Sequence, residues 1–156
     1  MQPTSAESDG PPSWLWWVLA AIVLALAVGI PLLVRSRRRQ AWRTDLASAE
    51  GEVAWFAREL IPELRRLNSP AEVAGGWNIA AGRVVAVEDR LTGLEPNAPD
   101  DAAQTRARSL RDAVRAARAR IEGLLQSGRP ETMRQDLDAV AAQLEQVLAA
   151  APPADW

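Results

Sequence analysis

Residues 69–94 read SPAEVAGGWNIAAGRVVAVEDRLTGL, and this stretch decides the fold. Apolar side chains recur there every three or four residues, at Val73, Trp77, Ala80, Val84, Val87, Leu91 and Leu94. That spacing is typical of an amphipathic helix with one buried face. Ser69, Pro70 and Glu72 form a capping box, so we expect a helix over 70–95. Gly75 and Gly76 weaken helices, which leaves Trp77 as an alternative start.

The same period continues toward the N-terminus and predicts a helix over 40–68. Its apolar positions are Trp42, Leu46, Ala49, Val53, Phe56, Leu60, Leu64 and Leu67. Pro62 has no backbone N–H to donate to the carbonyl of Arg58, so we expect a kink near this residue.

Two further helices are predicted on the C-terminal side. Asp101 and Gln104 form a candidate capping box for a helix over 101–127, which stops at Ser127-Gly128. Its apolar positions are Ala103, Ala107, Leu110, Val114, Ala117, Ile121 and Leu124. A last helix over 130–151 carries Met133, Leu137, Val140, Leu144, Val147 and Ala151, and residues 152–156 form a tail.

Short connections make successive helices antiparallel neighbours. The fold class is therefore all-α, with an up-down-up-down four-helix bundle or an elongated, coiled-coil-like helical domain. A three-helix bundle with a loose fourth helix and a coiled-coil dimer are the remaining alternatives.

The run from 14 to 34, WLWWVLAAIVLALAVGIPLLV, contains no charged residue and predicts a transmembrane helix. Residues 1–13 would then be a short, disordered tail outside the cytoplasm. Residues 35–43 form an arginine-rich juxtamembrane collar, here called the arginine collar. The residues expected at the membrane interface are Trp14, Trp16, Trp17, Arg35, Arg37, Arg38, Arg39, Trp42 and Arg43.

The arginine collar sets the expected orientation, because positive charge stays on the cytoplasmic side. Glu7 and Asp9 precede the run and no Arg does, so we expect the N-terminus outside and the C-terminal domain in the cytoplasm of a bacterial inner membrane. Cleavage as a signal peptide after Ala25-Leu26-Ala27 is the rival, but its basic region would stand on the wrong side.

Two association modes are open for this segment. Ala21, Ala25 and Gly29 recur every four residues, a spacing that allows close helix pairing and a homo-oligomer. Ordinary apolar filler in an alanine-rich sequence is the simpler explanation and the one we favour. The arginine collar also suits anionic lipid headgroups.

Composition removes most catalytic chemistry. The chain has no His, Cys, Tyr or Lys, and all 18 basic residues are Arg. Histidine bases, thiolate nucleophiles, Schiff-base lysines and Cys/His zinc sites are therefore excluded. The acidic doublets Glu88-Asp89 and Asp100-Asp101 lack the ligand count of a calcium loop. We predict no catalytic residue, no metal and no cofactor.

Arg108, Arg111, Arg115 and Arg118 form an arginine ridge on the 101–127 helix. In one interpretation the ridge pairs with carboxylates of adjacent helices, at Glu88, Asp89, Asp136, Asp138 or Glu145. In the other it contacts a partner. Nucleic acid is not expected, because the net charge is −2 and no recognition motif is present.

Large aromatic residues supply further candidates. Phe56 and Trp77 lie on the apolar faces and are predicted in the core. Trp55 lies one position off, so we expect an exposed partner contact beside Arg58 and Glu59. Trp156 ends the tail and is a candidate docking residue.

These patterns favour a single-pass membrane-anchored scaffold or accessory subunit that contacts an unidentified membrane or cytoplasmic protein. A helical bundle that relays a signal across the membrane is the alternative. An enzyme using carboxylates, Arg and a metal is the third hypothesis.

Overall fold

The computed structural model describes the backbone of residues 13–128 and 130–150, and every regular element there is helical. The side chains of residues 13, 15, 28–33, 130 and 131 lie outside the described part. In chain order the elements are α1 (Ser13–Trp55), the π-helix η1 (Phe56–Leu60), α2 (Ile61–Arg66), α3 (Pro70–Leu94), the 3-10 helix η2 (Glu95–Asn97), α4 (Asp101–Ser127) and α5 (Pro130–Ala149).

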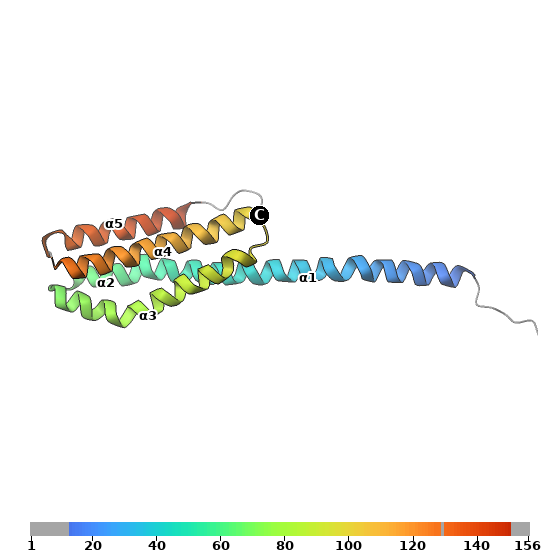
Figure 1. The fold of residues 1–156 in the computed structure, drawn as a ribbon, viewed down its shortest axis with the longest axis horizontal. Helices are drawn as coiled ribbons and strands as arrows, with labels where there is room; N and C mark the ends of the chain where they lie inside the picture. The colour runs from blue at the N-terminus through green and yellow to red at the C-terminus, as the bar shows by residue number, and fades with distance from the viewer. Residues whose placement is uncertain (1–12, 129, 151–156) are drawn as a thin grey trace, which may run out of the picture. The chain divides into compact units, whose positions relative to one another are not determined.

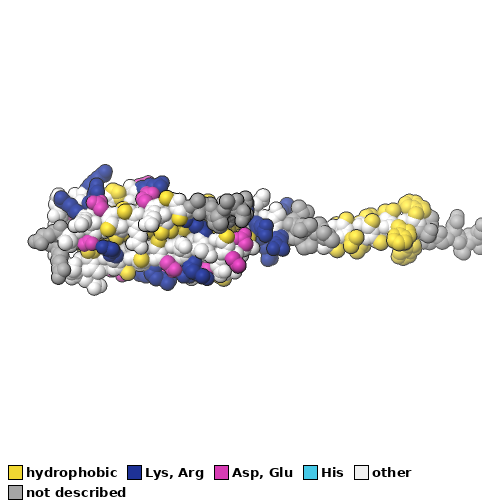
Figure 2. Space-filling view, turned by 90° about the horizontal axis from the view of Figure 1, so that it is seen from above, with side chains coloured by type: hydrophobic (Ala, Val, Ile, Leu, Met, Phe, Trp, Pro, Cys, Tyr) yellow, Lys and Arg dark blue, Asp and Glu magenta, His cyan; other side chains and the backbone are white. Residues whose placement is uncertain are grey.

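The chain divides into two compact units, Met1–Arg38 and Arg39–Trp156. In the first unit, the apolar side chains of α1 that the structure describes are exposed, as Figure 2 shows. Within the described residues, no helix combines the length and the apolar character needed to cross a membrane. The predicted span 14–34 includes positions 15 and 28–33, whose side chains lie outside the described part.

The second unit is a helical bundle, which confirms the all-helical fold class (Figure 1). Short turns make α2, α3, α4 and α5 run alternately up and down. α4 packs against both α3 and α5, and the η1–α2 segment packs against α5 and α3. The alternative with a loose fourth helix is wrong, because Met133, Leu137, Val140 and Leu144 of α5 are buried in the core.

The core contains nearly all of the predicted apolar positions in the bundle. In the segment from α1 through η1 to α2, the buried positions are Trp42, Leu46, Ala49, Val53, Phe56, Leu60 and Leu64. In α3 they are Val73, Trp77, Ala80, Val84, Val87, Leu91 and Leu94. Phe56 and Trp77 are core residues as predicted, with ring centroids 6.1 Å apart. One contiguous apolar core therefore joins all the bundle helices.

Near Pro62, where we expected a kink, the helix contains a π-turn over Phe56–Leu60. The N–H of Ile61 donates to the carbonyl oxygen of Phe56, five residues earlier. Pro62 then stands in the first turn of α2, where its missing N–H costs least. The extra residue in the turn lets the chain remain helical from Ser13 to Arg66.

The start of α3 settles the question raised by its glycines. Ser69 is the N-cap and its Oγ accepts from the N–H of Glu72 at 3.2 Å, so the alternative start at Trp77 is wrong. The Glu72 carboxylate accepts from the N–H of Asn68 at 2.9 Å, one residue earlier than in a regular capping box. An added Cβ on Gly76 would meet Leu64 Cδ2 at 2.9 Å, so this glycine permits the close approach of α2.

The ends of α4 follow ordinary capping chemistry. Asp100 is the N-cap and accepts from the N–H of Ala103 at 2.9 Å, so the cap lies one residue before the predicted Asp101. At the other end, Gly128 adopts the left-handed conformation with φ 60° and its N–H donates to Leu124.

Candidate functional site

The predicted membrane-interface residues are exposed, with one exception. Trp14, Trp16 and Trp17 expose 61%, 68% and 79% of their surface, and Arg35, Arg37, Arg38, Arg39 and Arg43 are exposed as well. Ala21 and Ala25 are also exposed, whereas Gly29 falls within the stretch whose side-chain surroundings lie outside the described part.

Trp42 is the exception, and its prediction as an interface residue is wrong. Its side chain is buried in the bundle core, and Nε1 donates to the carbonyl oxygen of Leu94 at 2.9 Å. Trp42 occupies the first position of the apolar face that continues through Leu46 and Ala49, so packing against α3 removes it from the surface.

The arginine ridge pairs within the bundle, and its partners outside α4 are Glu88 of α3 and Glu95, the first residue of η2. Arg108 donates to Glu95 at 2.8 Å, and Arg111 contacts the other oxygen of the same carboxylate. One heptad along α4, Arg115 donates to Glu88 at 2.7 Å and Arg118 Nε lies 3.2 Å from its second oxygen. Two pairs of arginines thus hold two glutamates seven residues apart, which aligns α3 and α4 in antiparallel register.

The interhelical pairing hypothesis is therefore confirmed for Glu88, which is only 7% exposed. Pairing of the ridge with α5 is wrong, because the α5 carboxylates have other partners. Arg120 pairs with Asp136, Arg65 with Asp138, and Arg58 with Glu145. Hydrogen bonds from Arg58 to Glu145, at 2.6 and 3.0 Å, lower the pKa of this carboxyl below its ordinary value.

Trp55 is half-buried rather than fully exposed, and its role as a partner contact stays a prediction. The guanidinium carbon of Arg83 lies 3.7 Å from the centroid of the Trp55 ring, a cation–π contact. Arg83 also donates from Nε to Glu52 at 2.6 Å, which lowers the pKa of Glu52. The indole is therefore covered on one side and open on another.

That open side belongs to an apolar groove between α3 and the η1–α2 segment, with a volume of about 620 Å³. Leu60, Leu64 and Ala80 lie at its buried base, and Trp55 and Leu67 are half-buried at its edges. Ile79 of α3 lines it and is 88% exposed. The sequence interpretation did not single out Ile79, although it stands one turn after the Gly75-Gly76 pair and off the apolar face.

Arg106 of α4, which is only 8% exposed, lies at the centre of a hydrogen-bond network that the sequence analysis did not predict. Its Nε donates to Glu50 of α1 at 2.8 Å, and its other nitrogens donate to the carbonyl oxygens of Val147, Leu148 and Ala150 at the end of α5. A guanidinium is favourable there because the last carbonyls of a helix lack donors and carry partial negative charge. The signal was available, since Arg106 lies three residues after Ala103 and four before Leu110, on the apolar face.

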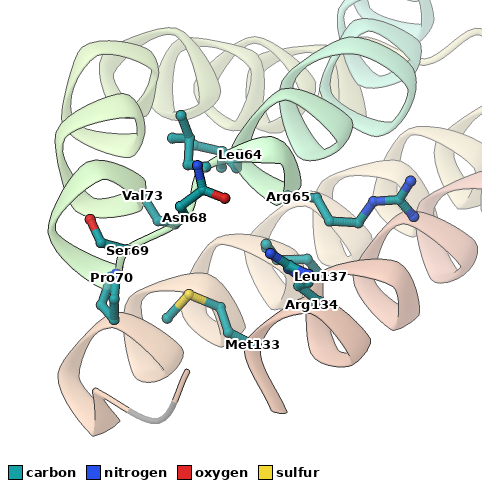
Figure 3. Close-up of a pocket in the computed structure, with 10 residues that line it drawn as sticks. Leu64, Arg65, Asn68, Ser69, Pro70, Val73, Met133, Arg134 and Leu137 are labelled. Atoms are coloured by element: carbon teal, nitrogen blue, oxygen red, sulfur yellow. The ribbon is translucent and has the colours of Figure 1, made fainter. Parts of the chain in front are cut away.

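A smaller cavity of about 250 Å³ lies at the turn between α2 and α3 (Figure 3). Its lining includes Asn68 and Ser69 of the turn and Pro70 at the start of α3, together with Met133, Arg134 and Leu137 of α5. Arg65 lines it too, but pairs with Asp138.

Within the described residues, no three Asp or Glu side chains converge so as to hold a metal ion. The acidic doublets have structural contacts instead, Glu88 with two arginines of α4 and Asp100 as the cap of that helix. Trp156 lies outside the described residues. Neither a family model, nor a curated protein, nor a solved structure matches this chain.

Proposed function

We propose that this protein is a single-pass, membrane-anchored helical scaffold or accessory subunit that acts through protein–protein contacts at the cytoplasmic face of the membrane. One observation carries the proposal: the N-terminal part of α1 displays apolar side chains to its surroundings on all sides. Among them are Trp17, Val18, Leu19, Ile22, Val23 and Leu24, each at least 46% exposed.

A helix that is apolar all round is stable only when it is buried in a protein core or in lipid. The described residues of the first unit have no protein core of their own. A bilayer about 30 Å thick would cover the run 14–34 at about 1.5 Å per residue. Trp14, Trp16 and Trp17 would then lie at one headgroup layer, with the arginine collar at the other.

The arginine collar supports a cytoplasmic location for the bundle and contact with anionic lipid headgroups, each Arg contributing about 1 kcal/mol near the surface. The bundle supports a binding role rather than a catalytic one. Its buried charged groups, Glu88 and Arg106, each form ion pairs with a residue of another helix.

The absence of Cys from the sequence permits a labelling test without background. We would introduce Ser5→Cys before the apolar run and, as the matched variant, Ser109→Cys on the exposed surface of α4. In intact bacterial cells, a membrane-impermeant maleimide should label position 5 alone, and position 109 only after lysis. Extraction of the chain by alkaline carbonate, or the reverse labelling pattern, would refute the anchor or its orientation.

The scaffold role has its own test. The chain, solubilised in a mild detergent, should co-purify with a stable protein partner or with further copies of itself. A lone monomer under gentle extraction would contradict this part of the proposal while leaving the anchor intact.

A further inference from the structure

The geometry of the groove between α3 and the η1–α2 segment points to a docking site for one amphipathic helix of a partner protein, with basic residues of that helix facing Glu63 and Glu72. Such docking rests on the proposed scaffold function and specifies the surface and the chemistry of the contact.

The shape of the groove is suited to a side-chain anchor. Its volume of about 620 Å³ lies in the range of sites that enclose a ligand, and Leu60 and Leu64 make its base apolar. Ile79 stands beside it with 88% of its surface exposed, the largest exposed fraction among the exposed large apolar residues of the described part. Ile79 therefore buries little surface in the isolated bundle, but a partner could pack against this side chain and insert one of its own into the groove beside it.

The two adjacent glycines of α3 support the same conclusion. Packing within the bundle explains the glycine at position 76, because a Cβ there would clash with Leu64. Gly75 also lines the groove, but a Cβ on it would meet nothing within 4 Å. The lack of a side chain at Gly75 therefore leaves this part of the groove open to an atom that approaches from outside.

The walls of the groove select a helix as the occupant. Both walls are helices, whose backbone N–H and C=O groups are already bonded within each helix, so they offer no edge to an extended peptide strand. A segment that enters an apolar groove must satisfy its own backbone groups, and a helix does this internally.

The charged residues at the two ends of the groove indicate which charge the partner helix carries. Arg83 at one end of the groove is already matched by Glu52 at 2.6 Å. At the other end are Glu63 and Glu72. The Glu72 carboxylate accepts a hydrogen bond from the N–H of Asn68, but in the part of the chain that the structure describes neither glutamate has a basic group within ion-pair distance. In a symmetric dimer of this chain with parallel α3 helices, Glu72 of one copy would face Glu72 of the other, and the like charges would repel. A partner helix with Arg or Lys at this end would instead compensate both Glu63 and Glu72.

The test uses the full chain in phosphatidylcholine nanodiscs and two fluorescent 20-residue helical peptides. Both peptides carry the same leucine face, and one has arginines on its flanks where the other has glutamates. Fluorescence anisotropy, with empty nanodiscs as the baseline, should show that the arginine peptide binds at least about 10-fold more tightly. Ile79→Arg should weaken that binding about 10-fold, and Val85→Arg, on another face of α3, should leave it unchanged.

Glu63→Arg should remove most of the preference between the two peptides, because the new guanidinium offsets the charge of Glu72. Circular dichroism should show all three variants folded, because these side chains are exposed. Equal binding of both peptides, no binding above empty nanodiscs, or an unchanged affinity of Ile79→Arg would overturn the docking proposal. A dimer that Ile79→Arg dissociates would also overturn it, in favour of a second copy. Failure of the wild-type chain to incorporate into nanodiscs would instead refute the proposed membrane anchor.

Discussion

The indole Nε1 of Trp42 donates a hydrogen bond of 2.9 Å to the carbonyl oxygen of Leu94. Trp42 is the first core residue of the bundle, and Leu94 is the last residue of α3. The carbonyls of a final helical turn lack the donor that a continuing α-helix would supply. The indole therefore stabilises the end of α3 and closes this end of the core with a single side chain.

Replacement of Trp42 should separate the hydrogen bond from the packing. Trp42→Phe, which keeps a ring but removes the donor, should lower the free energy of unfolding by at least about 1 kcal/mol. Trp42→Ala should lower it by about 3–5 kcal/mol because it also leaves a cavity. Chemical denaturation followed by circular dichroism measures both. Equal losses for the two variants would show that the hydrogen bond, not packing, dominates.

The adjacent glycines of α3 should respond in opposite directions to the same substitution. Gly75→Ala adds a methyl group in open space and should stabilise the bundle by about 0.5–1 kcal/mol through helix propensity. Gly76→Ala places its methyl 2.9 Å from Cδ2 of the buried Leu64 and should cost about 1–3 kcal/mol. Thermal unfolding of the two variants in parallel is the measurement. A stabilised Gly76→Ala variant would contradict the close approach of α2.

Arg106 should matter far more to stability than an exposed arginine of the same helix. Arg106→Met removes the bonds to Glu50 and to the last carbonyls of α5, at a cost of about 2–4 kcal/mol. Arg120→Met is the matched control, since Arg120 is 50% exposed and, among the described side chains, pairs with Asp136 alone, a contact that contributes about 0–1 kcal/mol. Chemical denaturation should therefore rank the two losses clearly. Similar losses would show that the capping of α5 is energetically minor.

The bundle should lose stability on the acidic side and not near neutral pH. Arg83 and Arg58 lower the pKa values of Glu52 and Glu145 in the folded state below their ordinary value of 4.5. These carboxylates therefore add stability above about pH 4.5, and the addition is lost as the pH falls through the lowered values. Without His or Cys, no side chain ordinarily titrates between pH 5 and 8.

The measurement is the unfolding midpoint as a function of pH. It should be flat from pH 6 to 8 and should fall below about pH 4.5. Glu145→Gln should lower the midpoint at pH 7 and reduce its dependence on pH in the acidic range. A transition near pH 6.5 in the wild-type chain, or an unaltered acid limb in Glu145→Gln, would contradict these assignments.

Much of the fold was predictable because the period of apolar residues is a local property of the backbone. The spacing Val73–Trp77–Ala80–Val84 places these side chains on one face whatever the rest of the chain does. The stop at Gly128 and the cap at Ser69 were likewise local, since a left-handed turn favours Gly and an N-cap favours Ser. The sequence prediction and the structure therefore agree on an all-helical bundle.

The candidate site was predicted less well because it depends on how the helices are rotated and aligned against each other. The arginine ridge was visible in the sequence, but its partners were not, since Glu88 and Glu95 meet it only when α3 and α4 are in register. Trp55 was predicted as a partner contact, but the groove beside it was not predicted, and neither was its contact with Arg83, which belongs to another helix.

The sequence by itself determined the helices, their buried faces, their turns and the chemistries that this protein lacks, because each depends on residue type and on spacing within one segment. Only the tertiary structure decided that Trp42 is buried, that Arg106 caps α5, and that Gly76 rather than Gly75 is required by packing. Those outcomes depend on contacts between residues as many as 52 positions apart, which are set by the packing of the whole core and not by any local pattern.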